Sequence, residues 1–555
     1  MGRVTFIVFI FAALVFGIIV GTRLAEYTGF EGSSIAYKKL NDAVTVIERQ
    51  YVDPVNEEKL TVQAIDGMLE SLDPHSVYMT AEQVRLSKED FSGNFDGIGI
   101  EFDIIHDTLI VVAPISGGPS EQLGIQAGDR IIQIDDESAI GITSNEVIRK
   151  LRGKKGTKVQ VLVLRSVESE PIAFTIVRDK IPTFSVDLAM MLDEQTGFIK
   201  ISKFVQTTHS EFVEAVKELR NQGMKRLVLD LRGNPGGFLD QAVLIADEFL
   251  DGGKKIVYTV SRIEMMNQTE FSKPGDLFEK DPVIVLVDKG SASASEIVSG
   301  ALQDHDRAII VGQTTFGKGL VQRQFEFSDG SAMRVTVSRY YTPLGRQIQR
   351  QFSTGAEGRR DYYLEAYNRK AADALLLDKN INMDSLWIHE RVIETAKYIM
   401  PDSLHPVFKT PSGRVVLGGG GIMPDYMVKV DTVTKYFRNL RNKRVFEEVA
   451  LSFLAGNNEK VKTQYEGDMK KFRDEFQVTG DLLQKVIING KKSGVLFDGK
   501  AYEKDKQQIK LAVKGRIARQ IWGFKGEIAM TTQDDAILEE ALTLFPKATL
   551  FSKAD

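Results

Sequence analysis

A buried strand, a glycine turn and a helix are predicted, in that order, by the sequence Val283-Ile-Val-Leu-Val-Asp-Lys-Gly-Ser-Ala-Ser-Ala-Ser-Glu-Ile-Val-Ser-Gly-Ala-Leu302. The turn holds three serines at alternate positions: Ser291, Ser293 and Ser295. At a helix N-terminus, free backbone N–H groups and the positive end of the helix dipole favour an oxyanion, which suits acyl-transfer chemistry. Serine is also a common helix N-cap. The stretch alone therefore does not say which serine, if any, is a nucleophile.

A lysine further along the chain is the candidate base. Thr315-Phe-Gly-Lys-Gly319 places Lys318 between two glycines, and the alternation from Leu320 to Phe327 predicts a strand after it. Only a neutral lysine accepts a proton, so its pKa must fall by about three units from about 10.4, at roughly 4 kcal/mol. Burial away from carboxylates achieves this. Gln322 is placed to orient the amine, or else is a surface amide on the strand.

A second strand, turn and helix are predicted by Arg226-Leu-Val-Leu-Asp-Leu231, Arg232-Gly-Asn-Pro-Gly-Gly237 and the amphipathic run from Leu239 to Leu250. Gly236 and Gly237 have no side chains in front of their amides, so both amides can donate to an anion. The loop lacks the Lys-Ser/Thr ending of a phosphate-binding loop and the Gly-x-Gly-x-x-Gly spacing of a dinucleotide site, which disfavours nucleotide binding.

Composition excludes several classes of protein. The 555 residues carry a nearly balanced net charge of −5, so nothing indicates a nucleic-acid partner. There is no cysteine, and no histidine pair has metal-ligand spacing, so a metal site is not expected. His305 lies not far beyond the serines and is a candidate for a Ser-His-Asp triad, but a histidine at such a position more often ends a helix, where its partial positive charge is favourable.

The two motifs Gly290–Glu296 and Thr315–Gln322 closely resemble the carboxyl-terminal processing (tail-specific) serine proteases. This resemblance, not the spacing, selects one serine of the three. It assigns the nucleophile to Ser293, the general base to Lys318, the base-orienting residue to Gln322, and the oxyanion hole to Gly236, Gly237 and the amide of Ala294. It implies a crotonase-like α/β core, a Ser/Lys mechanism and no cofactor.

Residues 91–181 resemble a PDZ domain. Gly97-Ile-Gly-Ile100 matches its carboxylate-binding loop, and Leu123-Gly-Ile-Gln-Ala-Gly-Asp129 matches its characteristic turn. The resemblance implies that an edge strand and loop amides hold the C-terminal end of a substrate, at Gly97, Ile98, Gly99 and Ile100. Arg152, after the predicted PDZ helix, is a candidate gate to the active site. A PDZ-like sandwich used only as a spacer is the alternative.

The N-terminus predicts a membrane segment. Residues 4–22 carry no charge and are almost wholly apolar, and these 19 residues are nearly enough to cross the hydrocarbon core. Residues 1–24 are expected to be an uncleaved anchor or a cleaved signal. With the resemblance, the chain is expected in the cell envelope, anchored in the inner membrane with its body in the periplasm, or exported after signal cleavage.

The predicted architecture is multidomain α/β. After the membrane segment come an N-terminal helical region (25–90), the PDZ domain (91–181), a protease core (182–435) and a C-terminal helical domain (436–555). The core contains an insertion at about 353–409: Thr342-Pro-Leu-Gly-Arg346 and Gly421-Ile-Met-Pro-Asp425 are some sixty residues further apart than in the resembled family. Thr410-Pro-Ser-Gly-Arg414 echoes the first passage. The terminal helices are candidates for homodimer or adaptor contacts.

The sequence therefore predicts an exported serine endopeptidase that processes or degrades unfolded or tagged proteins, selected through their C-terminal ends by the PDZ domain. Two alternatives stay open. One is a non-proteolytic PDZ scaffold with an inactive core. The other is an acyl-CoA-processing enzyme of the crotonase type, because strand-turn-helix units with oxyanion holes occur there too.

Overall fold

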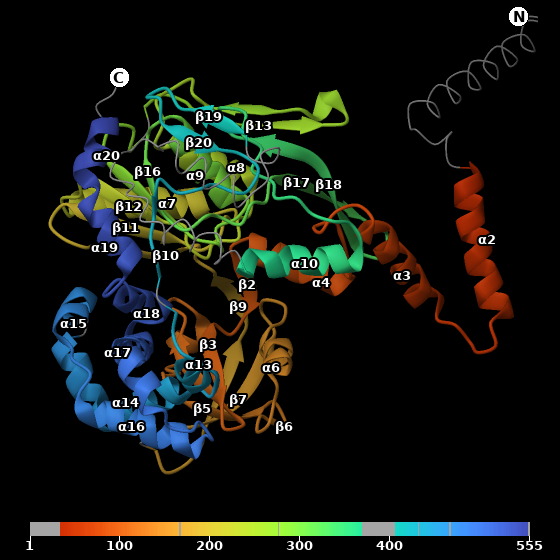
Figure 1. Cartoon of the computed structure of the whole chain (residues 1–555). Helices are drawn as coiled ribbons and strands as arrows, with labels where there is room; N and C mark the ends of the chain where they lie inside the picture. The colour runs from red at the N-terminus through yellow and green to blue at the C-terminus, as the bar shows by residue number, and fades with distance from the viewer. Residues whose placement is uncertain are drawn as a thin grey trace, which may run out of the picture.

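The computed structural model describes residues 34–165, 168–275, 277–368, 406–430, 432–465 and 468–552. A sheet-based core lies beside a PDZ domain, and helices from the C-terminal part of the chain run along both (Figure 1). The multidomain α/β architecture is confirmed. Within the described residues no helix is both long and apolar enough to span a membrane. The expected membrane segment, residues 4–22, lies outside them.

The central sheet has the order β10-β11-β12-β15-β16-β21, and all neighbours are parallel except β10 and β11. Its strands are β10 (Val186–Met191), β11 (Thr196–Ile201), β12 (Arg226–Asp230), β15 (Val283–Val287), β16 (Ile309–Gly312) and β21 (Tyr426–Met427). Every residue of β15 is buried, as a parallel strand covered on both faces requires.

Three helices cover one face of this sheet: α7 (Thr208–Asn221), α8 (Leu239–Asp247) and α9 (Ala294–Asp304). Phe212, Ile245 and Val298 from these helices share one apolar cluster with Leu229 and Val285 of the strands. Both strand-turn-helix units predicted from the sequence are confirmed. Because the strands are parallel, the two turns that follow β12 and β15 meet at the same edge of the sheet.

A second sheet stands against the first and carries the lysine motif. It contains β1 (Val77–Met79), β13 (Lys255–Ser261), β14 (Thr269–Phe271), β17 (Leu320–Glu326) and β18 (Ala332–Tyr341). β17 and β18 form an antiparallel hairpin, which confirms the strand predicted after Lys318. β1, from before the PDZ domain, pairs with β18 from well beyond it.

The PDZ domain leaves and re-enters the core through one short ribbon, β2 (Asn94–Gly97) paired with β9 (Asp179–Pro182). Its sheet comprises β3 (Ile100–Ile105), β4 (Thr108–Pro114), β5 (Arg130–Ile134), β6 (Glu137–Ser138), β7 (Lys158–Leu164) and β8 (Ile172–Val177). Helices α5 (Pro119–Gln122) and α6 (Ser144–Leu151) complete it, and Thr143 and Glu146 form a capping box at the start of α6.

The C-terminal helices lie beside the PDZ domain at the start of their run, and the last three of them pack on the other face of the central sheet (Figure 1). The C-terminal helices are α13 (Lys435–Asn442), α14 (Val445–Tyr465), α15 (Met469–Glu475), α16 (Gly480–Lys492), α17 (Gly499–Trp522), α18 (Phe524–Thr531), α19 (Ala536–Thr543) and α20 (Phe545–Phe551). Phe446 and Ile517 belong to one apolar cluster with Val228 and Ile284 of the sheet. Arg519 also pairs with Glu101 of the PDZ domain. Apolar residues of these helices are thus covered by this chain itself.

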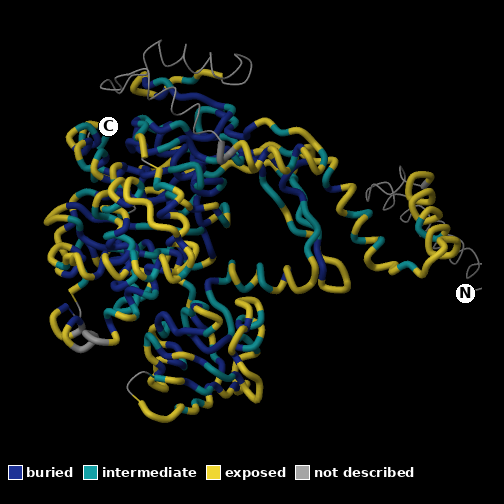
Figure 2. Tube along the Cα trace, turned by 60° about the horizontal axis from the view of Figure 1, so that its bottom comes forward, coloured by how far each residue is buried: buried dark blue, intermediate teal, exposed yellow. Residues whose placement is uncertain are grey.

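The N-terminal helices, unlike the C-terminal ones, are not packed against the other described residues along most of their length (Figure 2). α2 (Ser34–Gln50) and α3 (Glu57–Glu70) extend away from the body, and Figure 2 shows them largely exposed. Ile35 and Val52 are 84% and 86% exposed. Helix α4 (Ala81–Phe91) returns to the core. Of the insertion, the structure describes α10 (Gly355–Asn368) and β19 (Val407–Lys409), and residues 369–405 lie outside the described residues. Strand β19 pairs with β20 (Val415–Leu417), which follows the insertion.

Candidate active site

A cleft of about 630 Å³ lies where the two turns of the central sheet face β17, β18 and α4, and this volume is in the range of about 300–1,000 Å³ typical of ligand sites. The structure brings all six residues predicted for the catalytic centre to its wall: Gly236, Gly237, Ser293, Ala294, Lys318 and Gln322. Residues far apart in the sequence therefore meet in one cleft.

Ser293 differs from its two neighbouring serines in both backbone and surroundings. Its φ of 53° and ψ of −110° are unusual for a residue with a side chain, which indicates local strain of about 1–3 kcal/mol. Ser291 and Ser295 are fully buried, and their hydroxyls donate to the carbonyls of Leu231 and Asn234 at 2.8 and 3.0 Å. Only Ser293 of the three lines the cleft, so the structure separates serines that the sequence alone left equivalent.

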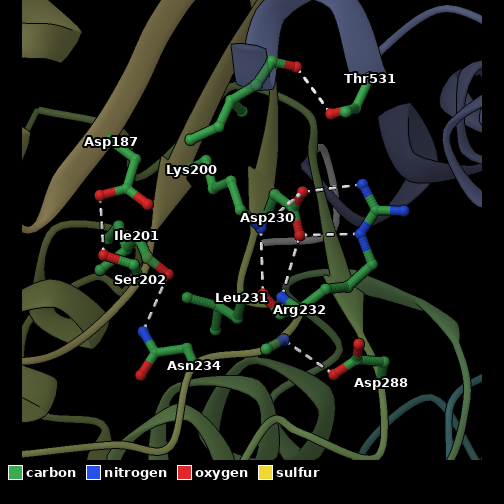
Figure 3. A network of polar contacts seen from close by, with 12 residues as sticks. Asp187, Lys200, Ile201, Ser202, Asp230, Leu231, Arg232, Asn234, Asp288 and Thr531 are labelled. Atoms are coloured by element: carbon green, nitrogen blue, oxygen red, sulfur yellow. Dashed lines mark hydrogen bonds and ion pairs between the residues drawn. The ribbon is translucent and has the colours of Figure 1, made fainter. Parts of the chain in front are cut away.

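The glycine turn after β12 presses against the nucleophile turn. A Cβ on Gly236 would lie 2.8 Å from Ser293 Cβ, and one on Gly237 would lie 1.9 Å from the Phe204 carbonyl oxygen, so neither position tolerates a side chain. The Gly236 amide donates to Asn234 Oδ1 at 2.8 Å, and the Asn234 amide group donates to the Ile201 carbonyl (Figure 3). The Gly236 amide, predicted as an oxyanion donor, is thus already engaged in this structure.

Lys318 meets its predicted partner. Its Nζ donates to Gln322 Oε1 at 3.0 Å. Burial lowers the pKa of Lys318, and the Arg334 charge on β18 lowers it further, while Glu296 and Asp73 oppose this. Both causes favour the neutral amine that a base requires.

Glu296 is a residue whose role the sequence reasoning missed. Its carboxylate is fully buried and accepts hydrogen bonds from the amides of Ser293, Gly317 and Lys318, at 2.8, 2.7 and 2.9 Å, and from the Thr315 hydroxyl. Burial raises its pKa, although these hydrogen bonds oppose the change. The one local signal was its position three residues after Ser293, as in a capping box. One carboxylate therefore ties the nucleophile turn to the lysine loop.

His75 lies on the base side of the site. Its Nδ1 is 3.2 Å from the Tyr363 hydroxyl and its Nε2 is 3.3 Å from the Tyr362 hydroxyl. Burial and the nearby Lys318 charge lower the pKa of His75 to about 3, so the ring is neutral. His305, by contrast, ends α9 and contacts the Lys255 carbonyl through Nε2, as expected for a helix-terminal histidine.

A buried ionic network supports the glycine turn from behind (Figure 3). Burial disfavours the charge of Asp230, but the Arg232 and Lys200 charges outweigh it and lower the pKa of Asp230 to about 2. Arg232 also pairs with Asp535, which caps α19, at 2.7 Å. The C-terminal helices therefore contact the residue that opens the Arg232–Gly237 turn.

The predicted peptide-binding loop joins β2 to β3. Ile98 is buried in the PDZ core, and its carbonyl accepts hydrogen bonds from the amide and hydroxyl of Ser120. Arg152 ends α6, donates to Glu89 of α4 at 3.1 Å, and stacks over the Phe95 ring at 4.3 Å. Because Ser87 and Lys88 of α4 line the active cleft, Arg152 connects the PDZ helix to an element of the cleft wall.

Models of known families match four parts of the chain. Peptidase family S41 matches residues 195–357, and a PDZ domain matches residues 110–165. The N-terminal domain of the activating protease CtpB matches residues 25–83, and a family of unknown function matches residues 436–523. The fold and cleft are thus those of a PDZ-containing peptidase.

Curated relatives give the family. A carboxy-terminal-processing protease of Bartonella bacilliformis is 41% identical over 56% of this chain and 73% of its own length. The carboxy-terminal processing protease CtpA of Bacillus subtilis is 38% identical over 57% of this chain and 67% of its own length. The chain belongs to the carboxy-terminal processing proteases of peptidase family S41.

Solved structures similar to this chain include the photosystem II D1 C-terminal processing protease, at 29% identity over 56% of this chain and 89% of that one, with a TM-score of 0.32. Another is the PDZ domain of a carboxy-terminal protease from Vibrio cholerae in complex with a peptide. It is 33% identical over 16% of this chain and 97% of that one, with a TM-score of 0.15.

Proposed function

We propose that this protease is an exported serine endopeptidase with Ser293 as nucleophile, Lys318 as general base and Gln322 as the residue that orients the base. The observation that carries the proposal is the hydrogen bond from Lys318 Nζ to Gln322 Oε1 in the cleft that Ser293 lines. A buried lysine amine bonded to a neutral amide rather than to a carboxylate favours its neutral form.

In the first step, neutral Lys318 takes the proton of the Ser293 hydroxyl while the oxygen attacks the peptide carbonyl carbon. The negative charge on the carbonyl oxygen is received by the amides of Gly237 and Ala294. The Gly236 amide donates to Asn234 instead, and because Gly236 has no side chain it leaves space for this oxygen beside the Ala294 amide. The Lys318 ammonium then gives its proton to the leaving amine, and an acyl-enzyme on Ser293 remains.

In the second step, Lys318 removes a proton from a water molecule that attacks the acyl-enzyme, and returns a proton to Ser293 as the product acid leaves. No metal or organic cofactor takes part in either step. Arg334 lies on the wall of the same cleft and disfavours the protonated form of Lys318 in both.

Substrate selection is assigned to the PDZ domain. An extended substrate end adds to the edge strand β3, and the loop of Gly97, Ile98, Gly99 and Ile100 receives its carboxylate. The contact of Arg152 with Glu89 supports a gating role, because α4 joins this contact to the cleft. Substrates are therefore unfolded or tagged proteins with free, apolar C-terminal ends.

The cellular setting follows from the N-terminal sequence. Residues 1–24 anchor the chain in the inner membrane with its body in the periplasm, or are removed after export. The exposed apolar residues of α2 and α3 support a homodimer or an adaptor contact through these helices. Fractionation of cells and light scattering of the purified chain test these two points.

The catalytic proposal is tested with full-length protein and an unfolded reporter that ends in apolar residues. Wild type is expected to cleave it, whereas folded Ser293→Ala and Lys318→Ala are not. Ser291→Ala is the matched control and is expected to retain cleavage, because its hydroxyl only holds the turn. Amidation of the reporter C-terminus is expected to slow cleavage by removing the carboxylate.

Three outcomes reject the proposal. Cleavage by Ser293→Ala at the wild-type rate excludes this nucleophile. An inert wild type that still binds the reporter through its free C-terminus supports the non-proteolytic scaffold instead. Binding of an acyl-CoA in the cleft, with no peptide cleavage, supports the crotonase-type alternative.

A further inference from the structure

Helix α10 begins the insertion that separates the two Thr-Pro-x-Gly-Arg passages. It packs against the turn of residues 73–76, because the Arg359 guanidinium donates to the carbonyls of Asp73 and Ser76 at 3.2 and 2.8 Å. It also lies beside the loop of residues 315–319, since the rings of Tyr362 and Phe316 meet edge to face. This part of the insertion therefore contacts the base side of the active site.

Hydrogen bonds connect the Tyr362 hydroxyl to both glycines that flank Lys318, directly to Gly317 and through Gln349 to Gly319. The hydroxyl donates to the Gly317 carbonyl at 3.2 Å. It also accepts from Gln349 Nε2 at 3.0 Å, and Gln349 Oε1 in turn accepts from the Gly319 amide at 2.8 Å. A single buried oxygen thus connects to the residue before and the residue after the base.

The aromatic ring of Tyr362 is fixed independently of its hydroxyl. The Arg350 guanidinium stacks at 4.1 Å from the Tyr362 ring and at 4.6 Å from the Phe316 ring. The Arg350 amide donates to the same Gly317 carbonyl at 3.0 Å. Removal of the hydroxyl alone therefore leaves the ring packed, which makes its contribution measurable.

Two flanking glycines make the Lys318 backbone adaptable, and Gly317 has a φ of +85°. Proton transfer requires the amine to be held within hydrogen-bond reach of its partner, so a loose backbone lowers the rate. We propose that Tyr362 is a positioning residue for the base, with its hydroxyl holding both glycine hinges of the Lys318 loop. This inference rests on the proposed Ser/Lys chemistry and gives a role to the start of the insertion.

The loop's packing also bears on the charge of Lys318. Titratable and charged groups from four surrounding segments face the Lys318 loop. They are Glu296 on α9, Arg334 and Tyr340 on β18, Asp73 and His75 on the 73–76 turn, and Tyr362 on α10 with Arg350 before that helix. A loosened loop admits water, which relieves the burial that lowers the pKa of Lys318. The acid limb of the pH–rate profile then moves to higher pH.

The test compares Tyr362→Phe with Tyr363→Phe in the full-length protein, on a fluorogenic peptide and over a pH series. Both variants keep their rings, but the Tyr363 hydroxyl contacts His75 and the Pro74 carbonyl rather than a glycine of the loop. Tyr362→Phe is expected to lower kcat by about 2- to 10-fold, the loss of roughly one hydrogen bond, with an unchanged KM. Its acid limb shifts to higher pH, whereas Tyr363→Phe stays within about twofold of wild type.

Gln349→Met breaks the same connection from its other side and is expected to act in the same direction as Tyr362→Phe. Equal kinetics of Tyr362→Phe and Tyr363→Phe, a change in KM alone, or loss of folding in both Tyr362→Phe and Gln349→Met overturns the inference. Ser293→Ala, run in parallel, reports separately on the proposed function: if it still cleaves, the nucleophile assignment fails whatever the tyrosine variants do.

Discussion

The two halves of the catalytic cleft are built in different ways. The Ser293 half comes from consecutive strand-turn-helix units of one sheet, and its main contacts are between backbones: Gly236 and Gly237 touch Ser293 and Phe204 directly. The Lys318 half is held by side chains from distant segments, among them His75, Glu296 and Tyr362. The geometry at Ser293 is therefore a property of the core fold, whereas the geometry at Lys318 depends on side chains from segments far apart in the sequence.

Glu296 joins the two halves through its side chain, beside a direct backbone hydrogen bond from the Phe316 amide to the Ser291 carbonyl at 2.9 Å. Its carboxylate bonds to the amide of Ser293 on one side and to the amides of Gly317 and Lys318 on the other. Tyr340 makes a second link, because its hydroxyl lies at the carbonyls of Ser293 and Lys318. Substitutions within each half, and at Glu296 between them, should therefore have different effects on stability, cleavage rate and the pH–rate profile.

The largest effect is expected in the backbone-built half. In Gly237→Ala the new Cβ meets the Phe204 carbonyl oxygen at 1.9 Å, so the turn must move. We expect a loss of at least about 2 kcal/mol of stability and of almost all cleavage activity. Thermal unfolding and reporter cleavage measure both. Gly233→Ala is the control, because it shares a positive φ of 71° but its Cβ meets nothing within 4 Å. Equal losses in the two variants would show that strain, not contact with the core, is responsible.

The next largest effect is expected at Glu296, which joins the two halves. Glu296→Gln replaces one acceptor oxygen with an amide donor that faces two amide donors, which costs roughly 1–3 kcal/mol, or about 10- to 100-fold in kcat. It also removes an anion that raises the pKa of Lys318, so the acid limb moves to lower pH. Glu248→Gln is the control for loss of a buried charge, because Glu248 is a buried glutamate bonded to His209. It should leave the acid limb of the pH–rate profile unchanged. A wild-type pH–rate profile in Glu296→Gln would contradict this role of Glu296.

A smaller effect of opposite sign is expected from Arg334→Gln, within the side-chain-built half. Arg334 lowers the pKa of Lys318, and in the proposed mechanism only neutral Lys318 accepts a proton, so activity is expected to rise as pH increases through that pKa. Loss of the Arg334 charge raises the pKa and moves the acid limb to higher pH. Arg339→Gln, exposed on the same strand, should not shift it. The pH–rate profile of kcat/KM distinguishes the variants, and a shift in the same direction as Glu296→Gln would refute the electrostatic argument.

The smallest effect at neutral pH is expected from His75→Gln. The pKa of His75 falls from 6.5 to about 3 on folding, so the unfolded chain binds more protons between these pH values. Stability from this group is complete above pH 6.5 and declines as pH falls towards 3, by at most about 1.4 kcal/mol per pH unit. The variant should show a flatter fall in stability across that window in urea unfolding. A slope equal to wild type would mean that His75 does not remain neutral in the folded state.

Sequence reasoning found the parts of the site that are local. The apolar run of β15, the glycines at 236 and 237 and the alternation of β17 are short-range patterns, and each lies where it was expected. The choice of Ser293 came from family resemblance, and the structure supports it because the other two hydroxyls are bonded inside the turn.

The parts that escaped prediction depend on long-range contacts. Tyr362 lies 287 residues from His75, and nothing in its neighbourhood in the sequence indicates that its hydroxyl reaches the lysine loop. The amide of Gly236 is engaged by Asn234 two residues earlier, a turn geometry that the glycine pattern does not fix. The C-terminal helical domain is predicted from the sequence, but the sequence does not say that this chain's own sheet covers apolar residues of its helices.

The pairing of β1 with β18 has a consequence for how the protein is made. Residues 77–79 pair with residues 332–334, which are synthesised much later. Tyr362, which contacts His75 of the 73–76 turn, is synthesised later still. A ribosome adds about 5–20 residues per second, so the 287 residues between His75 and Tyr362 take roughly 15–60 s to synthesise. Ser293 and Lys318 are made late in that interval, and until Tyr362 follows them the nascent chain lacks the hydroxyl that we propose positions the base, so the complete site forms only after residue 362 has been added.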